Sequence, residues 1–203
     1  MVMNGTARAD AQLSLKEAAV LSGVTEKVIR HELAAHVVRA SRTSAGTRRF
    51  RPRELLYFCL VAELPIELPK KDRRDLFDLL SAGVERRGRW RKEKHRLVLE
   101  GGVSVVLPID DLVARVEARV GLFLRGRDRV VSRPDVLSGE PVFSGTRIAV
   151  RFVGGRAQKE PAAVLLEDYP ALGRDDVEFA KMYVALGQPP GRPRRLRLVR
   201  GDG

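Results

Sequence analysis

Capping residues and short apolar repeats predict two helices near the amino end of the chain. Ser14 is followed three residues later by Glu17, a capping box that predicts a helix from Leu15 to about Ser22. Gly23 then supplies a turn, and Thr25 is an N-cap candidate for a second short helix. The pattern therefore predicts two short helices around a tight turn.

An arginine-rich stretch and a mainly apolar run follow these helices. Residues 37–53 carry six arginines and no acid, with Gly46 among the polar residues near the centre. Pro52 suits the first position of a helix, and the run from Leu55 to Leu64 is apolar enough to be buried. This order predicts an exposed wing followed by a third helix.

The next segment begins with an amphipathic helix. Apolar positions recur at helical spacing between Pro69 and Gly83. Aspartates recur at a spacing of three on the same helix: Asp72, Asp75 and Asp78. Because arginines interleave with them, the row is interpreted as the solvated face opposite the core rather than as a metal site.

Two strands and another helix are expected after it. Residues 89–100 and 103–108 alternate as strands do, and Gly101 with Gly102 suits a two-residue hairpin turn. A helix is expected over about 110–123. The hairpin has a free edge, through which this segment is expected to pair with a second copy of itself.

The last part of the chain is expected to begin with a sharp turn and to continue into two helices. Gly139, Pro141 and Gly145 indicate a stiff, sharply turned segment, which leads into a short β-like run. Helices are expected over about 161–167 and from about 174 onward.

Length and composition narrow the class of protein. The 203 residues are 44% hydrophobic and 32% charged, which is typical of a globular chain of one or two domains. The net charge of +12 favours a polyanionic partner, nucleic acid first. The single cysteine, Cys59, is interpreted as a core residue and fits a reducing compartment. The apolar runs are too short for a bilayer, so a cytoplasmic protein with no membrane partner is expected.

Two further basic stretches lie outside the predicted wing. Residues 86–96 hold seven lysines and arginines against Glu93 alone, and both a nucleic-acid contact and a solvated face fit them. Residues 188–203 read QPPGRPRRLRLVRGDG, and their prolines and glycines predict a flexible basic tail.

The first third of the chain resembles a known family. The segments AAVLSGVTEKVIRHEL, GTRRF and RPRELLYFCLVAEL are similar to the winged helix-turn-helix of MerR-type and excisionase-type DNA binders. The resemblance implies a helix in the major groove, a wing on the phosphates and Phe50 in the core. The implied DNA contacts are Thr25, Lys27, Arg30, His31, Arg42, Arg48 and Arg49. The alternative is that Lys27 and Arg30 only solvate a helix face.

The last third resembles the DUF433 family. Its G-x-P-x-x-x-G-T-R core is present as Gly139, Pro141, Gly145, Thr146 and Arg147, and EDYPAL is similar to the turn before its last helix. The resemblance implies a small homeodomain-like helical fold found in bacterial antitoxins, usually encoded beside a PIN-like ribonuclease toxin. Because the glycines and proline fix the local turn, Arg147 is expected to bond a carbonyl or a carboxylate rather than nucleic acid.

The basic tail is a candidate toxin-binding segment. It alternates arginines with apolar residues: Arg194, Arg195, Leu196, Arg197, Leu198 and Arg200. A PIN-like nuclease holds its metal with acidic side chains, and an inserted arginine would replace the charge of that metal. The alternative is a frayed, solvated terminus.

These features predict a mostly α fold with a small β component. The expected segments are a winged helix-turn-helix at 12–64, a helix and hairpin linker at 65–128, a homeodomain-like DUF433 module at 129–187 and the tail at 188–203. No catalytic residue, metal or cofactor is expected, because His31, His36 and His95 are not spaced with acids in a catalytic pattern.

The predicted function is that of an antitoxin of a type II toxin–antitoxin system. The chain would form a homodimer, bind operator DNA to repress its own operon, and neutralise a cognate PIN-like ribonuclease toxin by direct binding. The alternative is a DNA-binding transcriptional regulator or excisionase-like accessory protein without a toxin partner.

Overall fold

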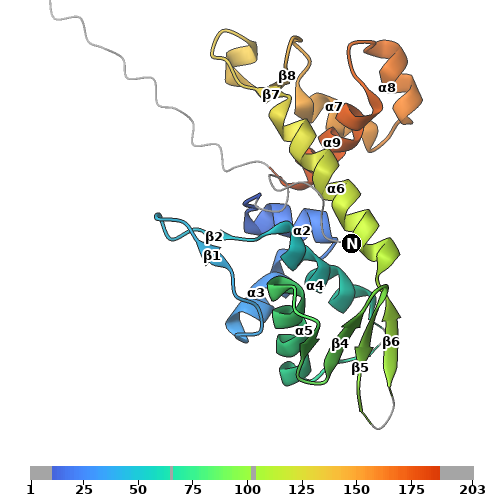
Figure 1. Cartoon of the computed structure of the whole chain (residues 1–203). Helices are drawn as coiled ribbons and strands as arrows, with labels where there is room; N and C mark the ends of the chain where they lie inside the picture. The colour runs from blue at the N-terminus through green and yellow to red at the C-terminus, as the bar shows by residue number, and fades with distance from the viewer. Residues whose placement is uncertain (1–10, 65, 102–103, 188–203) are drawn as a thin grey trace, which may run out of the picture.

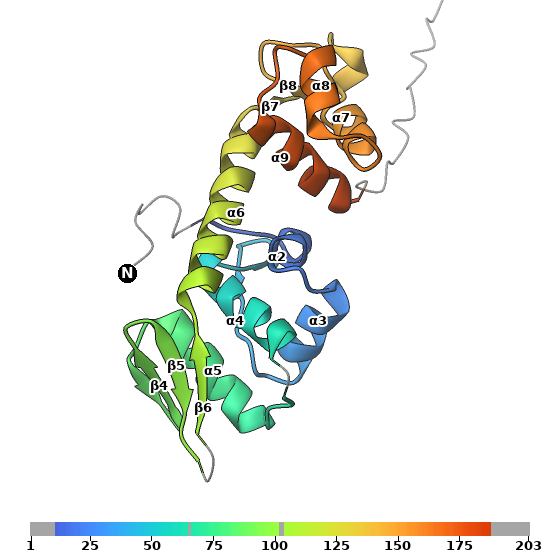
Figure 2. The ribbon, with the colours of Figure 1, turned by 90° about the vertical axis from the view of Figure 1, so that its right-hand side faces the viewer.

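The structure is a computed structural model that describes residues 11–64, 66–101 and 104–187. These residues form a mostly helical fold with small antiparallel sheets, as the sequence predicts. The long helix α6 (Asp110–Asp128) runs between the amino-terminal and the carboxy-terminal parts of the molecule (Figure 1). It lies beside the amino-terminal helices over part of its length and beside the carboxy-terminal helices at its far end (Figure 2).

The amino-terminal part contains the predicted helices and, between the second and the third, a two-stranded hairpin. The elements are α2 (Leu15–Ser22), α3 (Glu26–Ala34), β1 (Ser41–Arg42), β2 (Arg48–Arg49) and α4 (Pro52–Glu63). The capping box is confirmed, because the Ser14 amide donates to Glu17 Oε2 at 2.6 Å and the Glu17 amide donates to Ser14 Oγ at 3.2 Å. Gly23 ends α2 with a left-handed φ of +74°, and Thr25 caps α3.

The middle part differs from the prediction in its strands. Its elements are α5 (Lys70–Ala82), β3 (Arg86–Arg87), β4 (Trp90–Glu93), β5 (Arg96–Leu99) and β6 (Val105–Pro108). They give an antiparallel sheet in the order β3-β4-β5-β6. The single strand expected over 89–100 is wrong, because the chain reverses at Lys94 and His95. The two-residue turn is also wrong, since Leu99 pairs with Val105 and the connection is longer.

The aspartates of α5 do not form a solvated row. Asp72 is only 3% exposed; Arg89 donates to its carboxylate, and Trp90 Nε1 donates to its backbone carbonyl at 2.9 Å. Asp78 pairs with Arg87 at 3.3 Å. These aspartates therefore connect α5 to β3 and β4. The predicted solvated face is wrong because helix periodicity alone does not show that strands cover this side of the helix.

The carboxy-terminal part contains an additional helix. After α6 come β7 (Val130–Val131), a 3-10 turn (Leu137–Gly139), β8 (Val142–Phe143), α7 (Val150–Ala157), α8 (Ala162–Asp168) and α9 (Arg174–Ala185). The β-like run expected after Arg147 is reduced to one isolated bridge between Ala149 and Val142, and α7 begins at the next residue, Val150. A Cβ added at Gly154 would stand 2.3 Å from the Ala180 carbonyl oxygen, so the glycine lets α7 pack directly on α9.

Helix α6 fixes α9 through a close contact and ion pairs. A Cβ at Gly126 would lie 2.1 Å from the Phe179 ring, so the two helices meet at this glycine. Arg129 pairs with the buried Asp176 at 2.9 Å, and Arg125 pairs with Asp175 at 2.9 Å. Buried apolar side chains from all parts of the fold form one connected core. Helix α6 contacts both the amino-terminal helices and α9, so the predicted limits between the segments of the chain stay predictions.

The described residues contain neither a membrane-crossing helix nor a cluster of metal ligands. No helix among them has the length and apolar character that crossing a bilayer requires. No group of three or more His, Cys, Asp or Glu side chains among them is placed to hold a metal ion.

Candidate nucleic-acid interface

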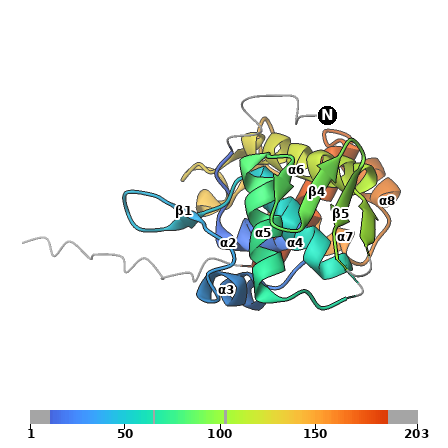
Figure 3. The same cartoon turned by 60° about the horizontal axis from the view of Figure 1, so that its bottom comes forward.

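A basic groove lies between the amino-terminal helices and the β1–β2 hairpin. The hairpin projects from the side of the molecule (Figure 3). The groove has a volume of about 540 Å³, and its lining includes Arg30 of α3, Arg42 of β1 and Arg48 of β2. Lys16 of α2 and Glu26 of α3 complete its charged lining. Three of the predicted DNA-contact residues are thus brought together from separate elements.

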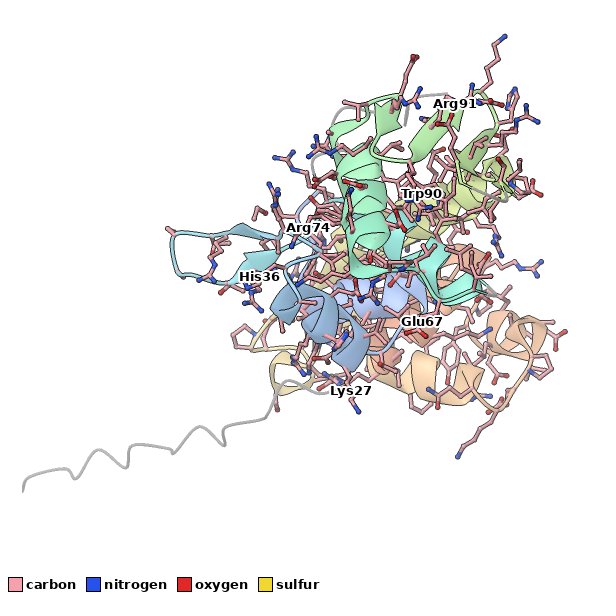
Figure 4. All side chains as sticks on the ribbon, turned by 90° about the horizontal axis from the view of Figure 1, so that it is seen from below. Lys27, His36, Glu67, Arg74, Trp90 and Arg91 are labelled. Atoms are coloured by element: carbon pink, nitrogen blue, oxygen red, sulfur yellow. The ribbon has the colours of Figure 1, made fainter. Side chains whose placement is uncertain are left out.

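The exposed side of α3 carries the remaining predicted helix residues. Thr25 accepts a hydrogen bond from the Val28 amide at 3.4 Å, so its hydroxyl serves the helix cap. Lys27 and His31 are exposed, and Lys27 lies at the outer side of the helix (Figure 4). Arg30 is paired with Glu26 at 2.6 Å across one helical turn. This face therefore holds cationic and hydrogen-bonding groups, with one arginine already bound to a carboxylate.

The hairpin separates the predicted wing arginines. Arg42 and Arg48 are paired directly across the two strands, and both line the groove. Successive side chains of a strand point to opposite faces, so Arg49 lies on the other face from Arg48. Its side chain is half-buried and is not part of the groove lining.

Buried polar contacts hold α3 in position beneath this surface. Glu32 of α3 is 3% exposed, accepts a hydrogen bond from Tyr57 Oη at 2.6 Å and pairs with Arg73 at 3.3 Å. Burial, and then the Glu32 carboxylate, raise the pKa of Tyr57. Arg74 Nε donates to the His36 carbonyl at 3.0 Å where α3 has ended (Figure 4). Helix α3 is therefore tied to both α4 and α5.

Sequence reasoning missed several of these residues. Lys16 was not singled out, although its place in the first turn of α2 puts it at the start of a helix facing the wing. Glu32 gives no local signal, because its partners come from distant helices. Phe50, in contrast, was expected in the core and is fully buried.

The middle basic stretch is paired internally. Arg86 and Arg91 both bind Glu100, at 2.7 and 3.2 Å, and Glu93 pairs with Arg96. These contacts favour a structural role for residues 86–96 over a free basic surface.

The glycine-rich motif in the carboxy-terminal part forms a fixed turn. Gly139 and Gly145 have left-handed φ values of +85° and +78°. Thr146 Oγ1 donates to the Phe143 carbonyl at 2.9 Å and accepts from the Ile148 amide at 3.0 Å. Arg147 is exposed and makes no hydrogen bond or ion pair with the described residues, so its expected bond to a carbonyl or carboxylate is absent there.

One known family matches this part of the chain. Residues 130–184 match DUF433, described as a protein of unknown function. The match covers β7 to α9, and it supports the predicted DUF433 resemblance for this segment. Comparisons with curated proteins and with solved structures return no match. The last helix of the DUF433 segment packs on α6, which precedes the matched residues.

The DUF433 segment exposes an aromatic cluster. Phe152 of α7 is 52% exposed, and its ring meets Tyr169 edge-on with centroids 6.1 Å apart. Arg156 lies over both rings and pairs with Glu160 and Asp168. Its hydrogen bonds to these carboxylates raise the pKa of Arg156. A surface that combines aromatic and charged side chains suits contact with another protein.

The predicted toxin-binding residues are outside the described part of the chain. They are Arg194, Arg195, Leu196, Arg197, Leu198 and Arg200, all within residues 188–203.

Proposed function

We propose that the chain binds operator DNA through residues 12–64, acting as a winged helix-turn-helix. In this proposal α3 enters the major groove and the β1–β2 hairpin follows the adjacent phosphate backbone. The observation that carries it is the groove in which Arg30, Arg42 and Arg48 meet. Guanidinium groups bind phosphate oxygens in a bidentate manner, and the amino end of a helix attracts the same anion.

In this proposal α3 and the β1–β2 hairpin have separate roles. Arg42 and Arg48 would contact phosphates, which positions the protein without reading sequence. Lys27 and His31, exposed on α3, would reach base edges and supply specificity. The ties from Glu32 to Tyr57 and Arg73 hold the helix against the body, so little ordering is needed on binding.

Fluorescence anisotropy with a labelled duplex from the chain's own promoter region tests the proposal. The double variant Arg42→Ala, Arg48→Ala is expected to bind at least tenfold more weakly at about 0.1 M salt. Each lost phosphate contact should also reduce the slope of log affinity against log salt by about 0.9. The matched control is Arg86→Ala, Arg91→Ala, which removes the same charge from the paired sheet. Equal binding by the two double variants would contradict the groove assignment.

We also propose that the chain is a type II antitoxin whose DUF433 segment contacts a PIN-like ribonuclease toxin. The exposed pair Phe152 and Tyr169, with Arg156 over both rings, is the observation that favours a protein partner. In this proposal α7, α8 and α9 act as the homeodomain-like module. A homodimer belongs to the same proposal, since β6 is an edge strand and Val106 on it is half-exposed.

Coexpression with the adjacent open reading frame tests the antitoxin role. A neighbour that is toxic alone and harmless with this chain supports it, and Phe152→Ala should weaken the rescue. The control Val164→Ala truncates another exposed apolar side chain of the segment. A harmless neighbour, together with retained operator binding, would instead favour the alternative of a regulator or excisionase-like accessory protein. Light scattering on the purified chain measures the number of subunits.

A further inference from the structure

A second hollow lies where the β1–β2 hairpin joins the body of the molecule, against the end of α5. Its volume is about 420 Å³, which is within the range of small-molecule sites. The lining comes from separate stretches of the chain: Arg39 before β1, Arg53 and Glu54 in the first turn of α4, residues between 77 and 84, and Arg87 of β3. The basic groove is lined by other residues, so the two hollows are separate.

Two arginines of this hollow have no acidic partner among the described residues. Arg39 is exposed, and neither it nor Arg53 forms an ion pair there. The Nε of Arg53 is buried and makes no hydrogen bond. A buried donor without an acceptor is rare in folded proteins and costs free energy. A ligand that brings an acceptor to Arg53 would remove this cost.

The carboxylates of the hollow are already engaged. Glu54 accepts a hydrogen bond from the Arg51 amide at 3.0 Å at the start of α4. Asp78 pairs with Arg87 at 3.3 Å. The lining holds three arginines against two carboxylates, which leaves one positive charge. A single carboxylate on a ligand would neutralise that charge and can accept two parallel hydrogen bonds from one guanidinium group.

Apolar side chains line another part of the same hollow. Val84 is 42% exposed, Ala82 is also exposed, and Phe77 lies buried beneath them. Small-molecule sites typically combine apolar walls with a few polar groups that fix the orientation of the ligand. An apolar group placed against Val84 would be removed from water and would add affinity that an inorganic anion cannot gain.

We infer that this hollow binds a small organic carboxylate, with its charged group on Arg39 and Arg53 and its apolar body against Val84 and Ala82. The site goes beyond the proposed DNA and toxin contacts and does not depend on them. Arg39 precedes the hairpin in the sequence and Arg53 follows it. A carboxylate bound to both would therefore link the two ends of the hairpin to α5.

NMR titration of the isotope-labelled full chain with 2-naphthoate tests the inference. A ligand of about 13 non-hydrogen atoms should bind with a dissociation constant of about 1 mM or lower. The signal of the Arg53 Nε–H should shift, since this donor gains an acceptor. Neutral 2-naphthamide has nearly the same shape and should bind roughly tenfold more weakly, because it lacks the charge.

Two substitutions locate the site. Arg53→Gln and Arg39→Gln should each weaken 2-naphthoate binding roughly tenfold. Because Arg39 is exposed, its variant keeps the test readable if Arg53→Gln does not fold. The matched control is Arg86→Gln, which should leave binding unchanged. Arg86 adjoins Arg87 on β3 but points to the opposite face of the strand, and it is bound to Glu100 at 2.7 Å.

Four results would overturn the inference. The absence of saturable binding at millimolar 2-naphthoate is the first. Binding that both arginine variants leave unchanged would place the ligand elsewhere. Equal affinity for 2-naphthamide would show that the arginines do not recognise the carboxylate. Inorganic phosphate that binds as tightly as 2-naphthoate would show that Val84 and Ala82 contribute nothing, so the class of ligand would be wrong.

Discussion

Glu26 has two opposing effects at the start of α3. Its carboxylate lies in the first turn, where a negative charge stabilises the helix dipole, and it pairs with Arg30 at 2.6 Å. The same carboxylate lines the groove in which phosphate is expected. A side chain that helps the free helix therefore repels the proposed ligand and occupies one of its arginines.

Glu26→Gln should consequently tighten DNA binding while it weakens the helix slightly. Removing one like charge about 4 Å from a phosphate is worth on the order of 1 kcal/mol in water, or about fivefold in affinity. The loss at the helix terminus should be about 0.5 kcal/mol. Anisotropy and urea unfolding measure the two effects. Glu178→Gln, which breaks the exposed pair with Lys181 on α9, is the matched control and should leave DNA affinity unchanged.

Cys59 should be unreactive in the folded chain. Its thiol is buried and donates a weak hydrogen bond to the Ser22 carbonyl at 3.5 Å. Burial raises the pKa of Cys59 to about 11, so the thiolate that reacts with alkylating reagents is scarce at pH 8. Maleimide labelling at pH 8 should be at least 100-fold slower in buffer than in urea. Rapid labelling of the folded chain would show that α4 opens at this position.

The same pKa sets the direction of a stability change at high pH. The folded thiol keeps its proton to a higher pH than the unfolded thiol, whose ordinary pKa is 9.0. The unfolded chain therefore binds fewer protons above pH 9, and the contribution of Cys59 to stability falls as the pH rises toward 11. Cys59→Ala removes this contribution, so the variant should lose less stability than the natural chain between pH 8 and 10, as measured by urea unfolding.

At the scale of elements, two adjacent glycines of α7 have different environments. A Cβ at Gly154 would lie 2.3 Å from the Ala180 carbonyl oxygen and 2.5 Å from Val184, whereas a Cβ at Gly155 would meet no atom within 4 Å. Glycine is unfavourable in a helix interior. The close approach of α9 requires it at position 154, whereas no contact requires it at position 155.

Alanine substitutions at these two positions should therefore have opposite signs. Gly154→Ala forces α7 away from α9 and should cost about 1–3 kcal/mol of unfolding free energy. Gly155→Ala should increase the unfolding free energy by about 0.5–1 kcal/mol through helix propensity alone. Urea unfolding followed by circular dichroism measures both, and each variant controls for the other. Destabilisation by Gly155→Ala would mean that α7 is packed on a face other than the one described.

The sequence predicts those elements whose signals are local. The caps at Ser14 and Thr25 and the turn at Gly23 depend on residues a few positions apart, so α2 and α3 were located correctly. The reversal between β4 and β5 has no glycine or proline, and α7 carries glycines that weaken its helical pattern. In both cases tertiary packing decides the structure.

The candidate site follows the same division. Its wing arginines were predicted because they cluster along the chain, and the resemblance implied which of them would contact DNA. Lys16 was not predicted, since it approaches the site only through the packing of α2. The burial of Asp72 and Glu32 could not be predicted from the sequence either, because their partners lie on other elements.

At the scale of the whole molecule, α6 joins parts that the sequence presents as separate segments. Its buried side chains belong to the same core as those of α4 and α9. The rings of Phe123 on α6 and Phe179 on α9 are 5.7 Å apart. Arg127 of α6 pairs with Glu17 of α2, and Arg129, which follows α6 directly, pairs with Asp176 of α9. Damage at one end of this helix should therefore affect the other end.

Trp90 gives a direct measure of this coupling. It is the single tryptophan of the chain, and it is fully buried between the sheet and α5, in a part of the fold remote from α7. If the described elements unfold together, Trp90 fluorescence and circular dichroism should give coincident urea transitions. Gly154→Ala should then shift the Trp90 midpoint by the same amount as the dichroism midpoint. An unmoved Trp90 transition would show that the DUF433 segment unfolds on its own and that α6 does not transmit its stability to the amino-terminal part.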